Sequence, residues 1–371
     1  MTKTNPANER IKRAYFEYLT EAGRRSEASV DGVAKAISRF EASTGGRDFS
    51  SFHIEQAKAF KRRLNEQLAQ RSGERLSRAT VHSTLSALRS FFIWLAGQPG
   101  FKRRISYADA DYFNLPEKDV RIAKAVRDKS VPTLEQVRHV LSVMPTTTDI
   151  ERRDRALIAF AALTGARDGA LASFQLKHLD LAEGVIHHDA RQVKTKFSKT
   201  FSTWFFPVGD EVLEIVSEWA AHLRSLHWGD ADPLFPSTRM EVGESGGFIA
   251  AGLDRRCWST AEPVRRIFRQ GFEAAGLPYF NPHTFRDMLA QLGERVCTSP
   301  EEFKAWSQNL GHENVLTTFT SYGAVSARRQ AELIRGLSGR SARASMPPED
   351  LLSQIAALLA GRNGDAGGPN A

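Results

Sequence analysis

The spacing of apolar residues over residues 8–97 is the feature that most constrains the fold of this chain. In four successive stretches, apolar side chains recur near the 3.6-residue period of an α-helix, with polar residues between them. The four stripes are Ile11, Tyr15, Tyr18 and Leu19; Val30, Val33, Ile37 and Phe40; Ile54, Ala57, Phe60, Leu64 and Leu68; and Val81, Leu85, Leu88, Phe92 and Leu95. Because each stripe must be buried, the pattern predicts a bundle of helices packed through these faces.

The fourth of these helices also carries a polar face of a particular kind. It begins at Ser77, a suitable N-terminal cap. On the side opposite its apolar stripe, Arg78, His82, Ser86 and Arg89 fall at successive helical-turn spacing. These side chains can donate to phosphates and to base edges. We therefore expect this face to bind DNA, although a merely solvated face would show the same spacing.

Turn-forming and charged residues then mark a domain boundary. Gly97-Gln98-Pro99-Gly100 ends the bundle, and residues 98–131 include the basic run Lys102-Arg103-Arg104. The pattern predicts a helical domain over residues 1–97, a linker over 98–131 and a second domain over 132–345. In that domain we expect one helix capped by Thr133 and another from about Asp154 to Leu163, ended by Gly165.

A change of periodicity within the second domain predicts a small sheet. Val185–His188 and Trp204–Val208 have the composition of strands. They flank residues 191–199, a basic stretch expected to form the tip of a hairpin. Helical patterns resume over residues 210–225 and 263–275 and again after Pro282. The chain is thus expected to be mainly α with a small antiparallel β-sheet, an α+β fold.

Charge is concentrated at the front of the chain. Of the net +8, residues 1–130 hold 25 Lys and Arg against 15 Asp and Glu, so the remainder is slightly acidic. A basic surface of this kind suits a nucleic-acid partner. No apolar run approaches the roughly 20 residues that a membrane span needs, so we expect a cytoplasmic protein that does not bind membranes. Cys257 and Cys297 are too few for a disulfide framework or a cysteine-rich metal site.

Five residues in the second domain suggest chemistry on a phosphodiester. Arg167 follows Thr164-Gly165-Ala166; His283 and Arg286 share the string His-Thr-Phe-Arg; His312 follows Leu310-Gly311; and Tyr322 comes ten residues later. Guanidinium groups bind phosphate oxygens bidentately, histidines donate or move protons, and a phenol can act as a nucleophile. A phosphate attacked by a side chain requires this combination of groups.

In their order, these motifs and the lysine-containing hairpin resemble the tyrosine recombinase (phage integrase) family. The resemblance covers about residues 8–340 and implies a core-binding domain and a catalytic domain that together clamp duplex DNA. It implies that Tyr322 attacks a DNA phosphate to form a 3′-phosphotyrosyl link, that Arg167 and Arg286 hold its oxygens, that His283 assists proton transfer, and that His312 hydrogen-bonds the phosphate. It also implies a dimer on each site and a tetramer in the synapse.

The resemblance implies a site-specific recombinase or integrase that needs no cofactor. The covalent link conserves the phosphodiester energy, so neither ATP nor a metal is expected. The sequence accordingly has neither a Gly-Lys-[Ser/Thr] phosphate loop nor a His-Glu-x-x-His motif. A metal could also be suggested by His187-His188 or Asp109-Ala110-Asp111, but neither has partners at ligand spacing, and we expect both to be solvated surface.

Some details depart from the family pattern or remain open. Ala170 stands where the family usually has an acidic residue, and the interval from His312 to Tyr322 is one residue longer than usual. A hairpin lysine would protonate the leaving oxygen; we favour Lys194, with Lys199 as the alternative. Each site residue, taken alone, could instead be structural.

Two rival functions also remain open. One is DNA relaxation by a type IB topoisomerase-like enzyme, and the other is a catalytically silent DNA-binding protein. Residues 346–371 are expected to form a short helix and a disordered tail. The helix would dock on a neighbouring protomer or fold back on its own domain; its apolar residues are Leu351, Leu352, Ile355, Leu358 and Leu359.

Overall fold

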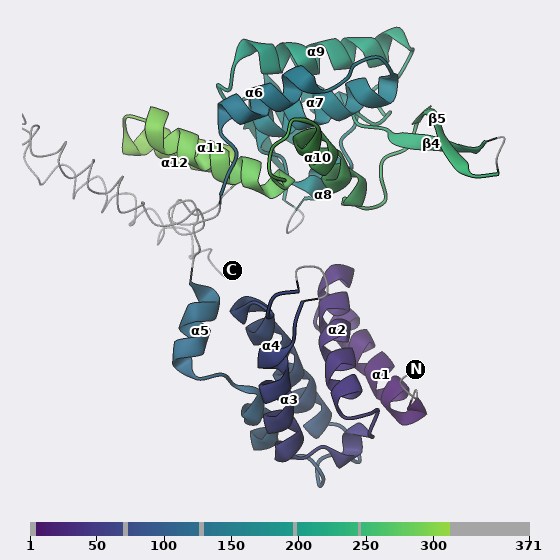
Figure 1. The fold of residues 1–371 in the computed structure, drawn as a ribbon, viewed down its shortest axis with the longest axis vertical. Helices are drawn as coiled ribbons and strands as arrows, with labels where there is room; N and C mark the ends of the chain where they lie inside the picture. The colour runs from purple at the N-terminus through teal and green to yellow at the C-terminus, as the bar shows by residue number, and fades with distance from the viewer. Residues whose placement is uncertain (1–4, 70–72, 126–129, 196–198, 244–245, 312–371) are drawn as a thin grey trace, which may run out of the picture. The chain divides into compact units, whose positions relative to one another are not determined.

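The computed structural model describes residues 5–69, 73–125, 130–195, 199–243 and 246–311, and the chain divides into two compact units (Figure 1). The N-terminal unit extends to Ala125 and the C-terminal unit begins at Val126. Both are built mainly from helices, and the C-terminal unit adds two small antiparallel sheets, which confirms the expected α+β class. Among the described residues, none of the helices is long and apolar enough to cross a membrane.

The N-terminal unit contains the four expected helices. Its elements are α1 (Pro6–Glu21), α2 (Glu27–Ser43), the 3-10 helix η1 (Phe49–Ser51), α3 (Ile54–Glu66), α4 (Arg78–Ala96), the 3-10 helix η2 (Tyr107–Phe113) and α5 (Glu117–Lys124). Helix α4 supplies the centre of the core, where Leu88, Phe91 and Phe92 are fully buried. Two residues of the expected stripes are exposed instead. Tyr18 is 46% exposed on α1. Leu68 lies beyond α3, because Gln67 already has an extended backbone.

The expected linker begins too early, because most of it belongs to the N-terminal unit. Ile105, Ala110 and Phe113 are buried in the same core as α4, and the ring of Phe113 stacks on Phe92 at 5.4 Å. The charged residues of this stretch are mostly exposed. They outnumber the three buried apolar residues, so the sequence pattern did not reveal that these are buried. The compact unit therefore extends to Ala125 and does not end at residue 97.

The C-terminal unit is organised around one buried helix. Its elements are α6 (Leu134–Val143), α7 (Asp149–Thr164), α8 (Asp168–Leu171), the 3-10 helix η3 (Leu176–His178), β1 (Leu179–Asp180), β2 (Val185–His188), β3 (Phe201–Trp204), α9 (Asp210–Ser225), β4 (Ser237–Val242), β5 (Phe248–Asp254), α10 (Glu262–Ala274), α11 (Pro282–Val296) and α12 (Pro300–Asn309). Helix α7 packs against α6, α9, α10 and α11 (Figure 1). Every residue from Ala156 to Leu163 is at most 2% exposed. This helix starts at Asp149, ahead of the expected Asp154, because Thr148 and Glu151 form a capping box.

The two sheets differ in how well the sequence predicted them. Strands β1, β2 and β3 pair in that order, all antiparallel, so β3 lies at an edge. The expected strand at residues 204–208 is wrong in its bounds, since β3 ends at Trp204. The backbone of Phe206 instead donates to the carbonyl of Leu163, which anchors the chain to the end of α7. The β4–β5 hairpin was not expected at all, because its strands lack a buried face: Val242 and Phe248 are exposed.

Candidate active site

Arg167 is placed by the turn that ends α7. Gly165 has φ +59°, and a Cβ there would lie 2.9 Å from the side chain of Leu289 and 3.0 Å from that of Leu310. Only glycine fits this conformation and this close approach without strain. The chain then turns into α8, with Arg167 as its N-cap residue. The half-buried Arg167 side chain lines a small hollow between α7, α8 and the sheet.

Arg286 reaches the same hollow from α11. Asn281 caps that helix, with its side chain accepting from the backbone N–H of His283 at 2.9 Å, and Pro282 occupies the first turn. One turn further on, Arg286 is only 3% exposed. Its guanidinium donates to the backbone carbonyl of Gly165 at 2.6 Å and to that of Leu310. Two carbonyls from distant parts of the chain thus fix a buried positive charge.

Lys194 also lines this hollow. It follows β2, and its backbone N–H donates to Ser173 Oγ at 2.9 Å. Its ammonium group donates to the carbonyl of Ser259 at 2.6 Å. Lys199, the alternative, is not among the residues that line the hollow. Of the two lysines, the structure therefore brings Lys194 to the arginines.

The hollow is cationic. Arg167, Lys194 and Arg286 line it, and none of the described residues that line it is Asp or Glu. Ala170, which stands at the position where an acidic residue was expected from the family pattern, lines the hollow without charge. A guanidinium held with little access to water, as that of Arg286 is, binds an anion more strongly than it would in solution. The site has the charge required to hold a phosphate.

His188 is a residue of this site that the sequence analysis misplaced on the solvated surface. It is 3% exposed, stacks on Phe201 at 4.1 Å and lies 3.3 Å from Thr203 Oγ1. Burial lowers the pKa of His188 to about 3, and the positive charges of Arg286 and Arg167 add to the effect. The imidazole is therefore neutral near pH 7. Its neighbour His187 is exposed, as expected.

The alternation of β2 was the available signal for His188. Residues two apart on a strand face the same side, so His188 shares the face of the apolar Ile186. The burial pattern of β2 follows this rule from Ile186 to His188, with His187 facing outward. His187 and His188 therefore lie on opposite faces of the strand, and the expectation that both are solvated is wrong for His188.

The remaining predicted catalytic residues are not placed in the hollow by the structure. His283 lies in the first turn of α11, with its side chain 57% exposed and Nε2 3.9 Å from Asp287 Oδ1. It is not among the residues that line the hollow. His312 and Tyr322 lie outside the described residues, as does the expected C-terminal helix. Their roles stay predictions.

The predicted DNA-binding residues share the outer side of α4. Arg78 is exposed and donates to Asn65 Oδ1 at 3.0 Å, and His82 is half-buried. Arg89 pairs with Asp111 at 2.8 Å, with both side chains about half exposed. An exposed ion pair of this kind contributes little stability, roughly 0–1 kcal/mol. Asp111 therefore holds the Arg89 side chain only weakly.

Comparison with known proteins agrees with this geometry. Residues 131–329, more than half of the chain, match the sequence model of the phage integrase family. Tyrosine recombinase XerC from Escherichia coli O157:H7 (strain EC4115 / EHEC) is 27% identical over 246 residues, which cover 66% of this chain and 69% of the relative. XerC from Salmonella typhi is 28% identical over the same length, covering 66% and 68%.

Two solved structures share the fold. A lambda integrase dimer bound to a COC′ core site has a TM-score of 0.58 at 15% identity, covering 88% of this chain and 83% of the other. XerH site-specific recombinase bound to its difH substrate has a TM-score of 0.54 at 16% identity, covering 86% and 82%. At such identities the likeness is one of fold, and membership follows from the family match. The chain is a member of the phage integrase family, the tyrosine site-specific recombinases.

Proposed function

We propose that this recombinase cuts and rejoins duplex DNA through a 3′-phosphotyrosyl intermediate formed by Tyr322. The observation that carries the proposal is the convergence of Arg167, Lys194 and Arg286, from three separate segments, on one hollow without acidic lining among the described residues. In the cleavage step, the tyrosine oxygen replaces the 5′ oxygen at phosphorus, and the protonated 5′ oxygen leaves as a 5′-hydroxyl. The reverse attack by a 5′-hydroxyl restores the phosphodiester and frees the tyrosine.

The two arginines would stabilise the charge that builds on the non-bridging oxygens. Arg286 is suited to this role because its guanidinium is already held by the Gly165 and Leu310 carbonyls, so little reorganisation is needed when the charge develops. Arg167 would approach the phosphate from the other wall of the hollow. Planar guanidinium groups match two phosphate oxygens at once.

Lys194 and the histidines would handle protons and additional hydrogen bonds. The Lys194 ammonium has three N–H donors, so its bond to the Ser259 carbonyl leaves others for the leaving 5′ oxygen. His283 would accept or relay the tyrosine proton, and His312 would donate to the phosphate. A tyrosine, with an ordinary pKa of about 10, needs this assistance near neutral pH.

We also propose that the N-terminal unit binds double-stranded DNA through Arg78, His82 and Arg89. Its excess of basic residues supports this assignment. On DNA, two protomers would occupy one site and four would form the synapse, with the helix expected from the sequence of residues 351–359 docking on a neighbour. The lambda integrase structure is a dimer on its DNA site, which supports the first of these steps by likeness of fold. The protein would act in the cytoplasm, without metal or nucleotide.

The test uses a half-site duplex with a nick beside the scissile phosphate. Cleavage releases a short strand that diffuses away, so the covalent protein–DNA adduct accumulates and is measured on a denaturing gel. Wild-type protein is expected to form the adduct, whereas Tyr322→Phe binds the duplex normally and forms none. Tyr279→Phe, which removes another phenol of the C-terminal unit, is the matched control and should form the adduct. An adduct with Tyr322→Phe would refute the assignment of the nucleophile.

Paired sites separate recombination from the other two functions. A recombinase exchanges strands between two copies of its site, and the products are detected by their new lengths. An enzyme that only relaxes supercoiled DNA gives no such products, and a silent protein gives no adduct at all.

A further inference from the structure

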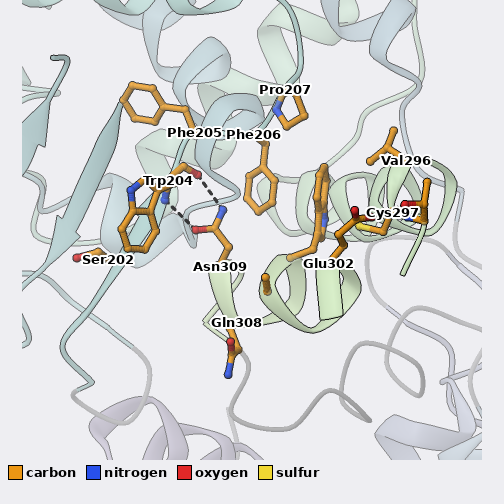
Figure 2. A pocket seen from close by; sticks show the side chains of 13 residues that line it. Ser202, Trp204, Phe205, Phe206, Pro207, Val296, Cys297, Glu302, Gln308 and Asn309 are labelled. Carbon is orange, nitrogen blue, oxygen red and sulfur yellow. Dashed lines mark hydrogen bonds between the residues drawn. The ribbon is translucent and has the colours of Figure 1, made fainter. Parts of the chain in front are cut away.

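Asn309, the last residue of α12, binds the edge strand of the sheet through its side chain. The backbone N–H of Trp204 donates to Asn309 Oδ1 at 2.8 Å, and Asn309 Nδ2 donates to the Trp204 carbonyl at 2.8 Å (Figure 2). Because β3 is the edge strand, these backbone groups would otherwise face outward without a neighbouring strand. The amide of Asn309 thus pairs with β3 as a further strand would.

The backbone of Asn309 is fixed to the same strand. Thr203, which is 2% exposed, donates from Oγ1 to the Asn309 carbonyl at 3.0 Å. Three hydrogen bonds therefore join one residue to two consecutive residues of β3. Such a cluster restrains both the side chain and the main chain at the end of α12.

This attachment fixes the carbonyl that holds Arg286. Leu310 directly follows Asn309 and is 1% exposed, and its carbonyl accepts from the Arg286 guanidinium. Gly311 comes next, with φ +71°, and a Cβ there would lie 2.9 Å from the ring of Phe201 on β3. The segment from Asn309 to Gly311 is thus seated on β3 at both of its ends, with the Arg286 acceptor in the middle.

We propose that Asn309 is a positioning residue for Arg286, an inference that rests on the proposed strand cleavage. Asn309 does not line the hollow; it acts by holding the Leu310 carbonyl where the guanidinium needs an acceptor. Without it, that carbonyl can shift, and the guanidinium meets the phosphate with a changed direction. A misplacement of about 1 Å can slow catalysis by roughly 100-fold, even when binding is unaffected.

Helix α12 does not depend on Asn309 for its attachment to the unit. Trp306 donates from Nε1 to the Leu289 carbonyl at 2.9 Å and packs on Phe206, with ring centres 4.8 Å apart. A Cβ at Gly293 would come within 2.6 Å of the Trp306 ring, so α12 sits closely against α11. Removal of the Asn309 amide is therefore expected to leave a folded protein.

The experiment compares full-length Asn309→Ala with wild type on the nicked half-site. Under single turnover with saturating protein, cleavage is expected to slow by about 10- to 100-fold, while the dissociation constant for the same duplex changes by less than about twofold. Gln308→Ala is the matched control, since Gln308 is the preceding, exposed residue of α12 and lines, together with Asn309, the pocket drawn in Figure 2. It should leave both quantities unchanged. The thermal midpoint is measured for each variant.

A second variant guards against misfolding of the first. Asn309→Asp keeps the shape and the acceptor for the Trp204 N–H but loses the donor to the Trp204 carbonyl. It is expected to fold and to cleave at a rate between those of wild type and Asn309→Ala. If Asn309→Ala shows no thermal transition, it is not folded. The cleavage rate of Asn309→Asp then tests the positioning role by itself.

Coupling to Arg286 distinguishes positioning from general support. In an Arg286→Lys background, the two-carbonyl grip is already lost, so adding Asn309→Ala should slow cleavage by less than about threefold further. A full additional loss would show that Asn309 does not act through Arg286. If wild type cleaves and both Asn309 variants cleave at the wild-type rate, the inference about Asn309 is wrong while the proposed function stands. Absence of cleavage by wild type would overturn the proposed function, and the inference with it.

Discussion

The buried imidazole of His188 makes the stability of the C-terminal unit depend on pH. Its pKa of about 3 in the folded protein lies far below the value of about 6.5 for an exposed histidine. Between these values the unfolded chain binds a proton that the folded chain does not. The contribution of His188 to the free energy of unfolding is therefore fully present above pH 6.5, and it is lost as the pH falls toward 3.

The expected loss at pH 5 is about 2 kcal/mol. At that pH an unfolded histidine is almost fully protonated, 1.5 pH units below its pKa, and each unit corresponds to about 1.36 kcal/mol. The result hardly depends on the exact folded pKa, since any value below about 4 leaves His188 neutral at pH 5. The free energy of unfolding should thus fall by about 2 kcal/mol between pH 7.5 and pH 5 because of His188 alone.

The assay is urea unfolding followed by tryptophan fluorescence at a series of pH values. Five of the six tryptophans belong to the C-terminal unit, so the signal reports mainly on that unit. His188→Phe keeps a ring stacked on Phe201 and cannot titrate. The difference between wild type and this variant removes the contributions of the other histidines.

Two outcomes decide the reasoning. Wild type should lose about 2 kcal/mol more than His188→Phe on going to pH 5. Parallel curves for wild type and His188→Phe would mean that His188 titrates normally in the folded protein, and the buried neutral imidazole would be wrong.

Three further predictions concern the proposed recombination. Arg167→Lys and Arg286→Lys should each slow single-turnover cleavage by about 100-fold or more with little change in DNA affinity, because lysine lacks the guanidinium fork; cleavage by Arg286→Lys at the wild-type rate would contradict the clamp. A fragment ending at Ala125 should bind duplex DNA with an affinity that falls steeply as the salt concentration rises, as measured by fluorescence anisotropy. An affinity that does not change with salt would contradict binding through basic residues. Truncation after Ala344 should leave half-site cleavage intact and abolish cooperative binding to full sites in a mobility-shift assay; unchanged cooperativity would show that the tail does not dock in trans.

Local patterns in the sequence were sufficient for most of the longer helices and for part of the site. Apolar stripes such as Val81 to Leu95 repeat with a period that only a helix buries on one side. Gly165 ended α7 where a left-handed residue was needed, and this placed Arg167 on the following turn. Arg286 and Lys194 were found through short motifs, and the structure brings both to the same hollow.

What the sequence did not predict depends on partners far away along the chain. Asn309 looks like an ordinary polar helix end until Trp204, 105 residues earlier, is seen beside it. Phe113 stands among charged residues, and only the aromatic core around α4 explains its burial. The β4–β5 hairpin has no buried stripe to reveal it, because its pairing partners are mostly each other.

The two carbonyl groups that accept hydrogen bonds from Arg286 have a consequence for the synthesis of the protein. One of them lies 121 residues before Arg286 and the other 24 residues after it. On a ribosome, the basic N-terminal unit emerges first, whereas both hydrogen bonds can form only when Leu310 has left the exit tunnel. Interrupted translation could yield a chain that ends between Gly165 and Leu310. Such a chain would bind DNA as proposed for the N-terminal unit, but it would lack the residues proposed to cut a strand. If the proposed roles hold, an unfinished chain would therefore bind DNA without cutting it.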